Sequence, residues 1–108
     1  MASVTLDTTA IHDFESFHRE CKRSFGFPGF YGRNMNAWID CLSYLPDGDG
    51  LSSFELLAGE QLFIRVPNFE AFSRRVPEVS TGLLECVAFV NRRYIEANDV
   101  PRLVIVLE

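Results

Sequence analysis

Three short segments with the composition of β-strands restrict the fold most, because long helical stretches separate them. They cover residues 3–6, 61–66 and 103–107 and are rich in β-branched, aromatic and other apolar residues. Antiparallel neighbours can be joined by a tight turn, whereas parallel strands need a long crossover that is usually helical. The sequence therefore predicts a small parallel sheet whose strands are connected through helices.

Hydrophobic periodicity and boundary residues predict four helices, over residues 13–25, 34–45, 68–75 and 77–97. The first three begin at side chains suited to an N-cap, Asp13, Asn34 and Asn68, and Pro77 fits the first turn of the fourth. Gly26 and Pro28 then stop the first helix. In the last helix the inward stripe is Val79, Leu83, Val87, Val90 and Tyr94, widened by Leu84, Cys86 and Ile95.

The order strand, two helices, strand, two helices, strand predicts an α/β fold. We expect a three-layer-like arrangement of a three-stranded parallel sheet and about four packed helices, with right-handed crossovers that place the helices against the sheet. Residues 103–107 are apolar at every position, which is typical of a strand covered on both faces, so we expect this strand at the centre. Without repeats or linkers, residues 1–108 are interpreted as a single domain.

The acidic composition restricts the kinds of partner. The 108 residues include 15 Asp or Glu against 10 Lys or Arg, a formal net charge of −5. Nucleic acid and anionic membranes repel an acidic surface, so we expect neither, and a basic protein is the favoured partner. No apolar run approaches the length of a membrane span, and the N-terminus lacks the pattern of a signal peptide.

The cysteines indicate a reducing environment. Cys21, Cys41 and Cys86 are odd in number, far apart and without a C-x-x-C pair, which suits neither a disulfide framework nor zinc. Each falls in a helical pattern, where a free cysteine behaves as a small buried hydrophobe. We therefore expect a cytoplasmic protein. We also expect it to be monomeric when free.

Residues 46–50 read Pro-Asp-Gly-Asp-Gly and superficially look like a calcium-binding loop. The glutamate that closes an EF-hand is missing, since position 58 is Ala58. We expect no metal and no cofactor.

His18 and Cys21 are the candidates for catalytic chemistry, because three residues of helix bring them to one face. However, Cys21 continues the apolar stripe of Phe14, Phe17 and Phe25, and no third residue is placed to orient the pair. Structural packing is the favoured interpretation, and we expect no catalytic residue. A small enzyme that uses His18 and Cys21 is kept as an alternative.

Residues 27–45, FPGFYGRNMNAWIDCLSYL, combine a Pro-Gly loop with a short amphipathic helix. The inward stripe of that helix is Met35, Trp38, Leu42 and Leu45. The opposite side carries Asn36, Ile39, Asp40 and Ser43. An isoleucine among polar residues on an outward face fits a contact surface better than a buried stripe.

The same stretch resembles the barstar family, small intracellular inhibitors of secreted bacterial ribonucleases. The resemblance rests on Pro28, the loop Phe30-Tyr31-Gly32, the cap Asn34 and the helix end Asp40-Cys41-Leu42. It covers residues 27–45 closely and the two ends of the chain more loosely. The family's fold is a three-stranded parallel sheet with helices packed around it, in agreement with the pattern above.

The resemblance implies a function for this loop and helix. In the family they enter a ribonuclease active site, where the helix aspartate takes the place of a substrate phosphate. Asp40 is then the dominant partner-binding residue, and its partner is a basic ribonuclease. The other implied contacts are Phe30, Tyr31, Asn36, Ile39, Ser43, Tyr44 and Glu96. Because Asn36 stands where the family has an aspartate, we expect weaker electrostatic steering here.

Two alternatives stay open for this surface. An immunity protein or an interaction module could use it against a toxin that is not a ribonuclease, or against another protein. In the simplest interpretation, Tyr31 and Gly32 only close a loop, Asn34 only caps the helix, and Asp40 is merely exposed.

Gly32 is the residue of this loop that we expect to take a positive φ or to need a close backbone approach. It lies between Tyr31 and the Asn34 cap, where the chain turns into the helix, and glycine reaches that conformation without a steric penalty.

Overall fold

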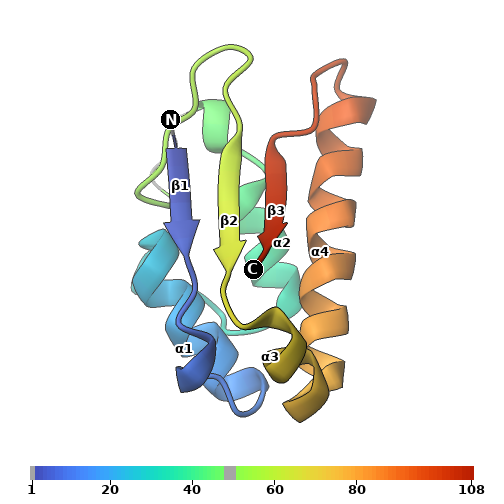
Figure 1. Cartoon of the computed structure of the whole chain (residues 1–108). Coiled ribbons are helices and arrows are strands. Elements are labelled where there is room, and N and C mark those ends of the chain that lie inside the picture. The colour runs from blue at the N-terminus through green and yellow to red at the C-terminus, as the bar shows by residue number, and fades with distance from the viewer. Residues whose placement is uncertain (1, 48–50) are drawn as a thin grey trace.

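The structure is a computed structural model that describes residues 2–47 and 51–108. Its centre is a parallel sheet of three strands, β1 (Ala2–Thr5), β2 (Leu62–Val66) and β3 (Leu103–Leu107), arranged in the order β1-β2-β3 (Figure 1). Val4 pairs with Ile64, and Ile64 pairs with Ile105. The predicted parallel α/β sheet is confirmed.

Within the described residues, four α-helices connect the strands in the predicted order. They are α1 (Phe14–Phe25), α2 (Met35–Leu42), α3 (Phe69–Arg75) and α4 (Pro77–Glu96). Two short 3-10 helices, Thr8–Ala10 and Leu45–Asp47, lie in the connections. The predicted helix over residues 34–45 is therefore shorter than expected, because it ends at Leu42 and the chain tightens into a 3-10 turn at Pro46.

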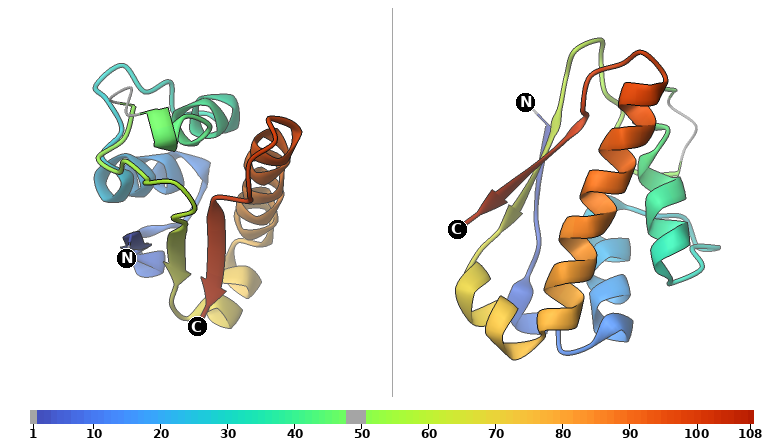
Figure 2. Two further views of the ribbon diagram at one scale, coloured as in Figure 1. Left: turned by 90° about the horizontal axis from the view of Figure 1, so that it is seen from above. Right: turned by 90° about the vertical axis from the view of Figure 1, so that its right-hand side faces the viewer.

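The helices α1, α2 and α4 lie on one side of the sheet (Figure 2, right). The chain adds its strands in one direction, β1 then β2 then β3, and successive right-handed crossovers in one direction place their helices on the same face. On the opposite face, the register brings Ser3, Phe63 and Val104 into one row and Thr5, Arg65 and Val106 into the next. That face carries no helix in the described part of the chain.

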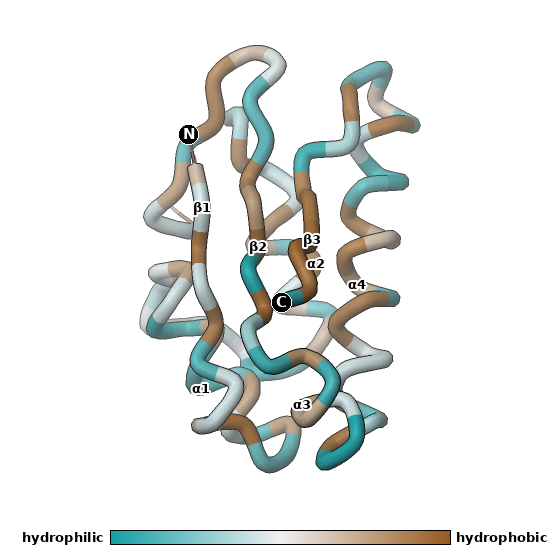
Figure 3. Tube along the Cα trace, in the orientation of Figure 1, coloured by the Kyte–Doolittle hydropathy of each residue, from teal (hydrophilic) through white to brown (hydrophobic). Residues whose placement is uncertain are grey.

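The expectation that residues 103–107 form the central strand is wrong. β2 is central and β3 lies at the edge, although β3 is the most continuously hydrophobic strand (Figure 3). Its first residue, Leu103, is buried, whereas Val104, Ile105 and Val106 are only partly covered. The apolar run therefore does not come from helices on both faces, and such a run alone does not distinguish a central from an edge strand.

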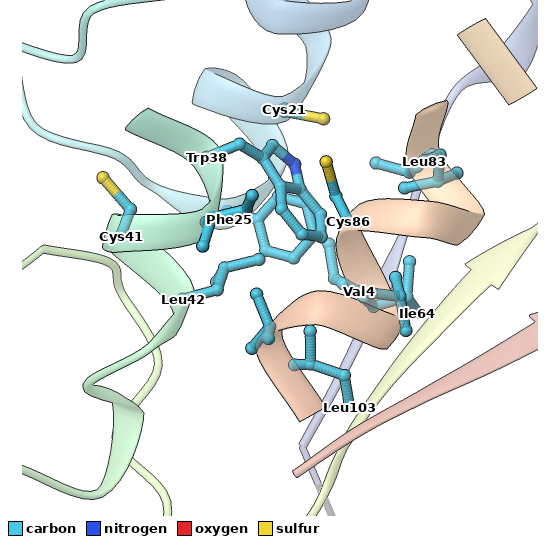
Figure 4. Close-up of a cluster of buried hydrophobic side chains, with 14 of the residues drawn as sticks. Val4, Cys21, Phe25, Trp38, Cys41, Leu42, Ile64, Leu83, Cys86 and Leu103 are labelled. Carbon is cyan, nitrogen blue, oxygen red and sulfur yellow. The ribbon is translucent and has the colours of Figure 1, made fainter. Parts of the chain in front are cut away.

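Trp38 fills the centre of the core between the helices and the sheet (Figure 4). Its side chain is fully buried and packs edge-on against Phe25, at 5.9 Å between ring centroids. Cys21, Cys41 and Cys86 are all buried, as predicted, and none of these three forms a disulfide. In the last helix the predicted stripe is buried, but Ile95 is 54% exposed and does not widen it.

The ends of α1 and the start of α2 follow from local hydrogen bonding. Asp13 accepts from the amide of Ser16, and Gly26 ends α1 in the left-handed conformation at φ 70°. Asn34 Oδ1 accepts from the amide of Ala37 at 2.8 Å and caps α2. Asn68 precedes α3 with φ 53° but makes no side-chain cap hydrogen bond, so this part of its predicted role is wrong.

The prediction of a positive φ at Gly32 is wrong, because the turn places Arg33 in the left-handed region instead, at φ 54°. Close approach does apply at Gly32. A Cβ there would lie 3.2 Å from Asn34 Nδ2 and 3.5 Å from Ala37 Cβ, so the cap and the first turn of α2 crowd this position.

Two sequence interpretations concern residues outside this framework. The calcium-loop interpretation falls on residues 46–50, of which 48–50 lie outside the described residues. Within residues 2–47 and 51–108, no helix is long and apolar enough to cross a membrane.

Tyr94 joins the C-terminal end of α2 to α4. Its hydroxyl donates to the carbonyl of Leu42 at 2.6 Å and accepts from the amide of Leu45 at 3.1 Å. The carbonyl belongs to the last residue of α2, and the amide belongs to the first residue of the 3-10 helix Leu45–Asp47. Both are positions where intrahelical partners run out. One buried side chain thus satisfies two polar groups and fixes α2 against α4.

We predict that Tyr94→Phe lowers the free energy of unfolding by about 1–3 kcal/mol, because it leaves a buried carbonyl and a buried amide without a partner. Denaturant unfolding measures the loss. Tyr44→Phe is the matched control, since Tyr44 is 44% exposed and its variant should unfold like the wild type. Equal stabilities of the two variants would contradict this role of Tyr94.

Candidate functional site

The exposed face of α2 is narrow and polar. Asn36 and Asp40 are one helical turn apart and both are exposed. Ile39, by contrast, is only 9% exposed and belongs to the hydrophobic core. The expectation that Ile39 projects outward is therefore wrong, because half of the eight residues of α2 are buried: Trp38, Ile39, Cys41 and Leu42.

The loop before α2 presents one aromatic ring and buries the other. Phe30 is 78% exposed, whereas Tyr31 is only 6% exposed. The hydroxyl of Tyr31 lies 2.6 Å from Nδ1 of His18, which is itself 2% exposed. Burial raises the pKa of Tyr31 and lowers that of His18, so both are neutral at pH 7. Tyr31 thus anchors the loop from inside, while Phe30 is available to a partner.

A cavity of about 630 Å³ opens beside the C-terminal end of α2. It is lined by Asp40, Ser43 and Tyr44 from the α2 side and by Arg93 and Asp99, among others, from the α4 side. Asp99 is held by Arg102, whose guanidinium lowers the pKa of that carboxyl. The sequence-predicted residues Asp40, Ser43 and Tyr44 therefore meet at one concave surface.

Arg93 is the residue of this surface that sequence reasoning missed. Its Nη1 lies 3.1 Å from Asp40 Oδ1 and donates to Ser43 Oγ at 3.2 Å. Its guanidinium also lies over the ring of Phe89, 5.3 Å from the centroid. Arg93 is therefore the ion-pair partner of Asp40, the residue that the resemblance makes dominant in partner binding.

Glu96 is exposed and is not among the residues that line the cavity. The ionic group that α4 brings to Asp40 is Arg93 and not Glu96. The structure thus brings together Asp40, Ser43 and Tyr44, with Asn36 one turn away, and it does not join Glu96 to them.

The catalytic alternative loses its chemical basis. Cys21 is fully buried, and burial raises the pKa of its thiol, so the thiolate that a cysteine nucleophile requires is disfavoured. Nδ1 of His18 faces Tyr31, and the indole N–H of Trp38 points toward the Cys21 side of the core (Figure 4). Cys21 is therefore a packing residue. In the part of the chain that the structure describes, no group of three or more His, Cys, Asp or Glu side chains could hold a metal ion.

Comparison with known protein families gives one match. The sequence matches the family described as Barstar (barnase inhibitor) over residues 1–106, nearly the whole chain. The chain belongs to the barstar family. A search of curated proteins found no match.

Family membership agrees with the geometry in two respects. The barstar family consists of inhibitors rather than enzymes, which fits the inert packing of Cys21. In the part of the chain that the structure describes, the sheet of three parallel strands with four α-helices is a barstar-like α/β fold, and it holds α2 with its polar side outward.

We predict that stability falls as the pH drops below 6.5, the ordinary pKa of histidine, because the folded pKa of His18 lies below it. Below that pH, the unfolded chain binds a proton that the native state does not bind. The contribution of His18 to the free energy of unfolding is therefore fully present above pH 6.5 and is lost as the pH falls through the folded pKa. Four carboxylates also have lowered pKa values, but they reduce stability only at more acidic pH, below their ordinary pKa values of 3.8 to 4.5. They are Asp7, Asp13, Asp99 and Glu108.

Denaturant unfolding at pH 7.5 and at pH 5.5 measures this loss. His18→Gln should reduce the difference between the two pH values, whereas His12→Gln, at an exposed position, should retain it. An identical pH dependence in the wild type and in His18→Gln would contradict the assignment.

Proposed function

We propose that this barstar-family protein inhibits a ribonuclease by inserting the loop before α2 and the exposed face of α2 into the enzyme's active site. The whole chain acts as one unit in the cytoplasm, without catalysing a reaction and without a metal or cofactor. It is monomeric until it binds its target, a basic protein.

The observation that carries this proposal is the position of Asp40. Its side chain is 63% exposed on a helix whose opposite side is buried through Trp38 and clamped by Tyr94. A carboxylate on a rigid element loses little conformational freedom when it binds. An active site that cleaves RNA must hold phosphates with cationic groups, and a fixed carboxylate can occupy the same position.

The remaining predicted residues divide into two roles. Phe30, Asn36, Ser43 and Tyr44 would contact the enzyme, because they are exposed or line the cavity beside Asp40. Tyr31 and Ile39 would not touch the enzyme, since both are buried. They would hold the loop and α2 in the orientation that binds. Glu96 would lie at the periphery of the contact.

A toxin other than a ribonuclease is the second candidate target, and one observation favours it. Arg93 neutralises Asp40 within the free protein, so the surface is less acidic than its carboxylates alone would make it. A target without a cluster of cations would tolerate such a surface better.

Inhibition of ribonuclease activity tests the proposal. Barnase, the enzyme named in the family description, and other small basic ribonucleases are assayed with increasing amounts of the purified protein. We expect stoichiometric inhibition of at least one of these enzymes. Full activity of every enzyme at a large excess of the protein would contradict the proposal.

We predict that Asp40→Ala weakens binding to the inhibited ribonuclease by about 2–5 kcal/mol, a range taken over from charge pairs such as those of barnase and barstar themselves. The fold should be unchanged, because Asp40 lies outside the core. Association and dissociation rates measure the effect.

Glu70→Ala is the matched control. Glu70 is an exposed carboxylate on a helix, paired with an arginine four residues away, as Asp40 is paired with Arg93. It lies on α3, so its variant should bind like the wild type. Equal affinities of Asp40→Ala and Glu70→Ala would place the binding surface elsewhere.

A further inference from the structure

We propose that Arg93 is a specificity-determining residue, which disfavours target sites built from cations alone. The inference rests on the proposed function and refines it. It implies a target that presents a cation to Asp40 and, beside it, an anionic group to Arg93.

Three contacts hold Arg93 in place. Nη1 bonds both Asp40 and Ser43, and the guanidinium lies over the ring of Phe89. Phe89 is one turn before Arg93 on α4, so the ring supports the side chain from its own helix. Arg93 is thus positioned at the predicted contact surface itself and is not a distant surface charge.

The ion pair can open, but the positive charge stays. The side chains of Arg93 and Asp40 are 41% and 63% exposed, and an ion pair in that environment is weak. A target cation can therefore displace Arg93 from Asp40. The target cation then lies close to the guanidinium of Arg93, which stays at the edge of the same cavity because Arg93 belongs to α4. Like charges placed together in an interface oppose binding.

The carboxylate of Asp99 does not cancel this charge. Asp99 also lines the cavity, but both of its carboxylate oxygens are bonded by Arg102, which is 5% exposed and fixed by the carbonyls of Leu57 and Glu60. Arg93 and Asp40 are therefore left to present charges of opposite sign to a partner. A site with a carboxylate beside its cation complements both of them.

Barnase is the probe for this inference, because its substrate is a polyanion and its active site must hold phosphate. Dissociation constants and association rates are measured for the wild type, Arg93→Ala and Arg92→Ala. Arg92→Ala removes the same charge from the adjacent residue, which is exposed, so the comparison separates the local contact from the net charge. Circular dichroism and thermal unfolding establish that all three proteins are folded.

We expect Arg93→Ala to bind barnase at least about 10-fold more tightly than the wild type, through faster association and slower dissociation. Arg92→Ala should change only the association rate, and by much less. Equal or weaker binding of Arg93→Ala would overturn the inference. So would undetectable binding of both the wild type and Arg93→Ala, because removing Arg93 would then not have opened the surface to a cationic site.

This outcome is separate from that of the proposed function. The proposed function fails when the wild type inhibits no ribonuclease. The present inference concerns a different quantity, the ratio of the dissociation constants of Arg93→Ala and the wild type for one enzyme. An inhibitory wild type with an unchanged ratio would leave the function in place and remove the role of Arg93.

Discussion

The packing of α2 is the constraint on which the rest of the structure depends. A helix of eight residues is too short to be stable in water by itself. Trp38 supplies the buried surface that holds it, and the Tyr94 hydroxyl satisfies its C-terminal end while fixing it to α4. The same two contacts therefore hold α2 in the orientation that leaves Asp40 exposed.

Most of the fold could be predicted because its signals are local. Caps such as Asp13, Asn34 and Gly26 act within a few residues, and helical periodicity needs only one stretch of chain. The place of β3 could not be predicted in this way. Strand order depends on which strands meet in space, and an apolar run such as residues 103–107 has the same composition at an edge as at a centre.

The site was predictable only in part, for a related reason. Asp40, Ser43 and Tyr44 follow one another along one segment, so their common surface could be anticipated. Arg93 is 53 residues from Asp40 in sequence, and the register of α4 against α2 brings them together. Ile39 was expected to project outward and Tyr31 to contact a partner, but both are buried, because burial on a short helix and its loop depends on the neighbouring elements. For Tyr31 the neighbour is His18 of α1, whose Nδ1 lies 2.6 Å from the Tyr31 hydroxyl.

Amide hydrogen exchange of the free and ribonuclease-bound protein tests the central claim most directly, that the loop before α2 and the outer face of α2 form the binding surface. The account predicts that bound ribonuclease slows exchange in residues 30–44 and in the part of α4 around Arg93, and leaves the open face of the sheet unchanged. Slower exchange confined to β1 and β3, with none in residues 30–44, would contradict it.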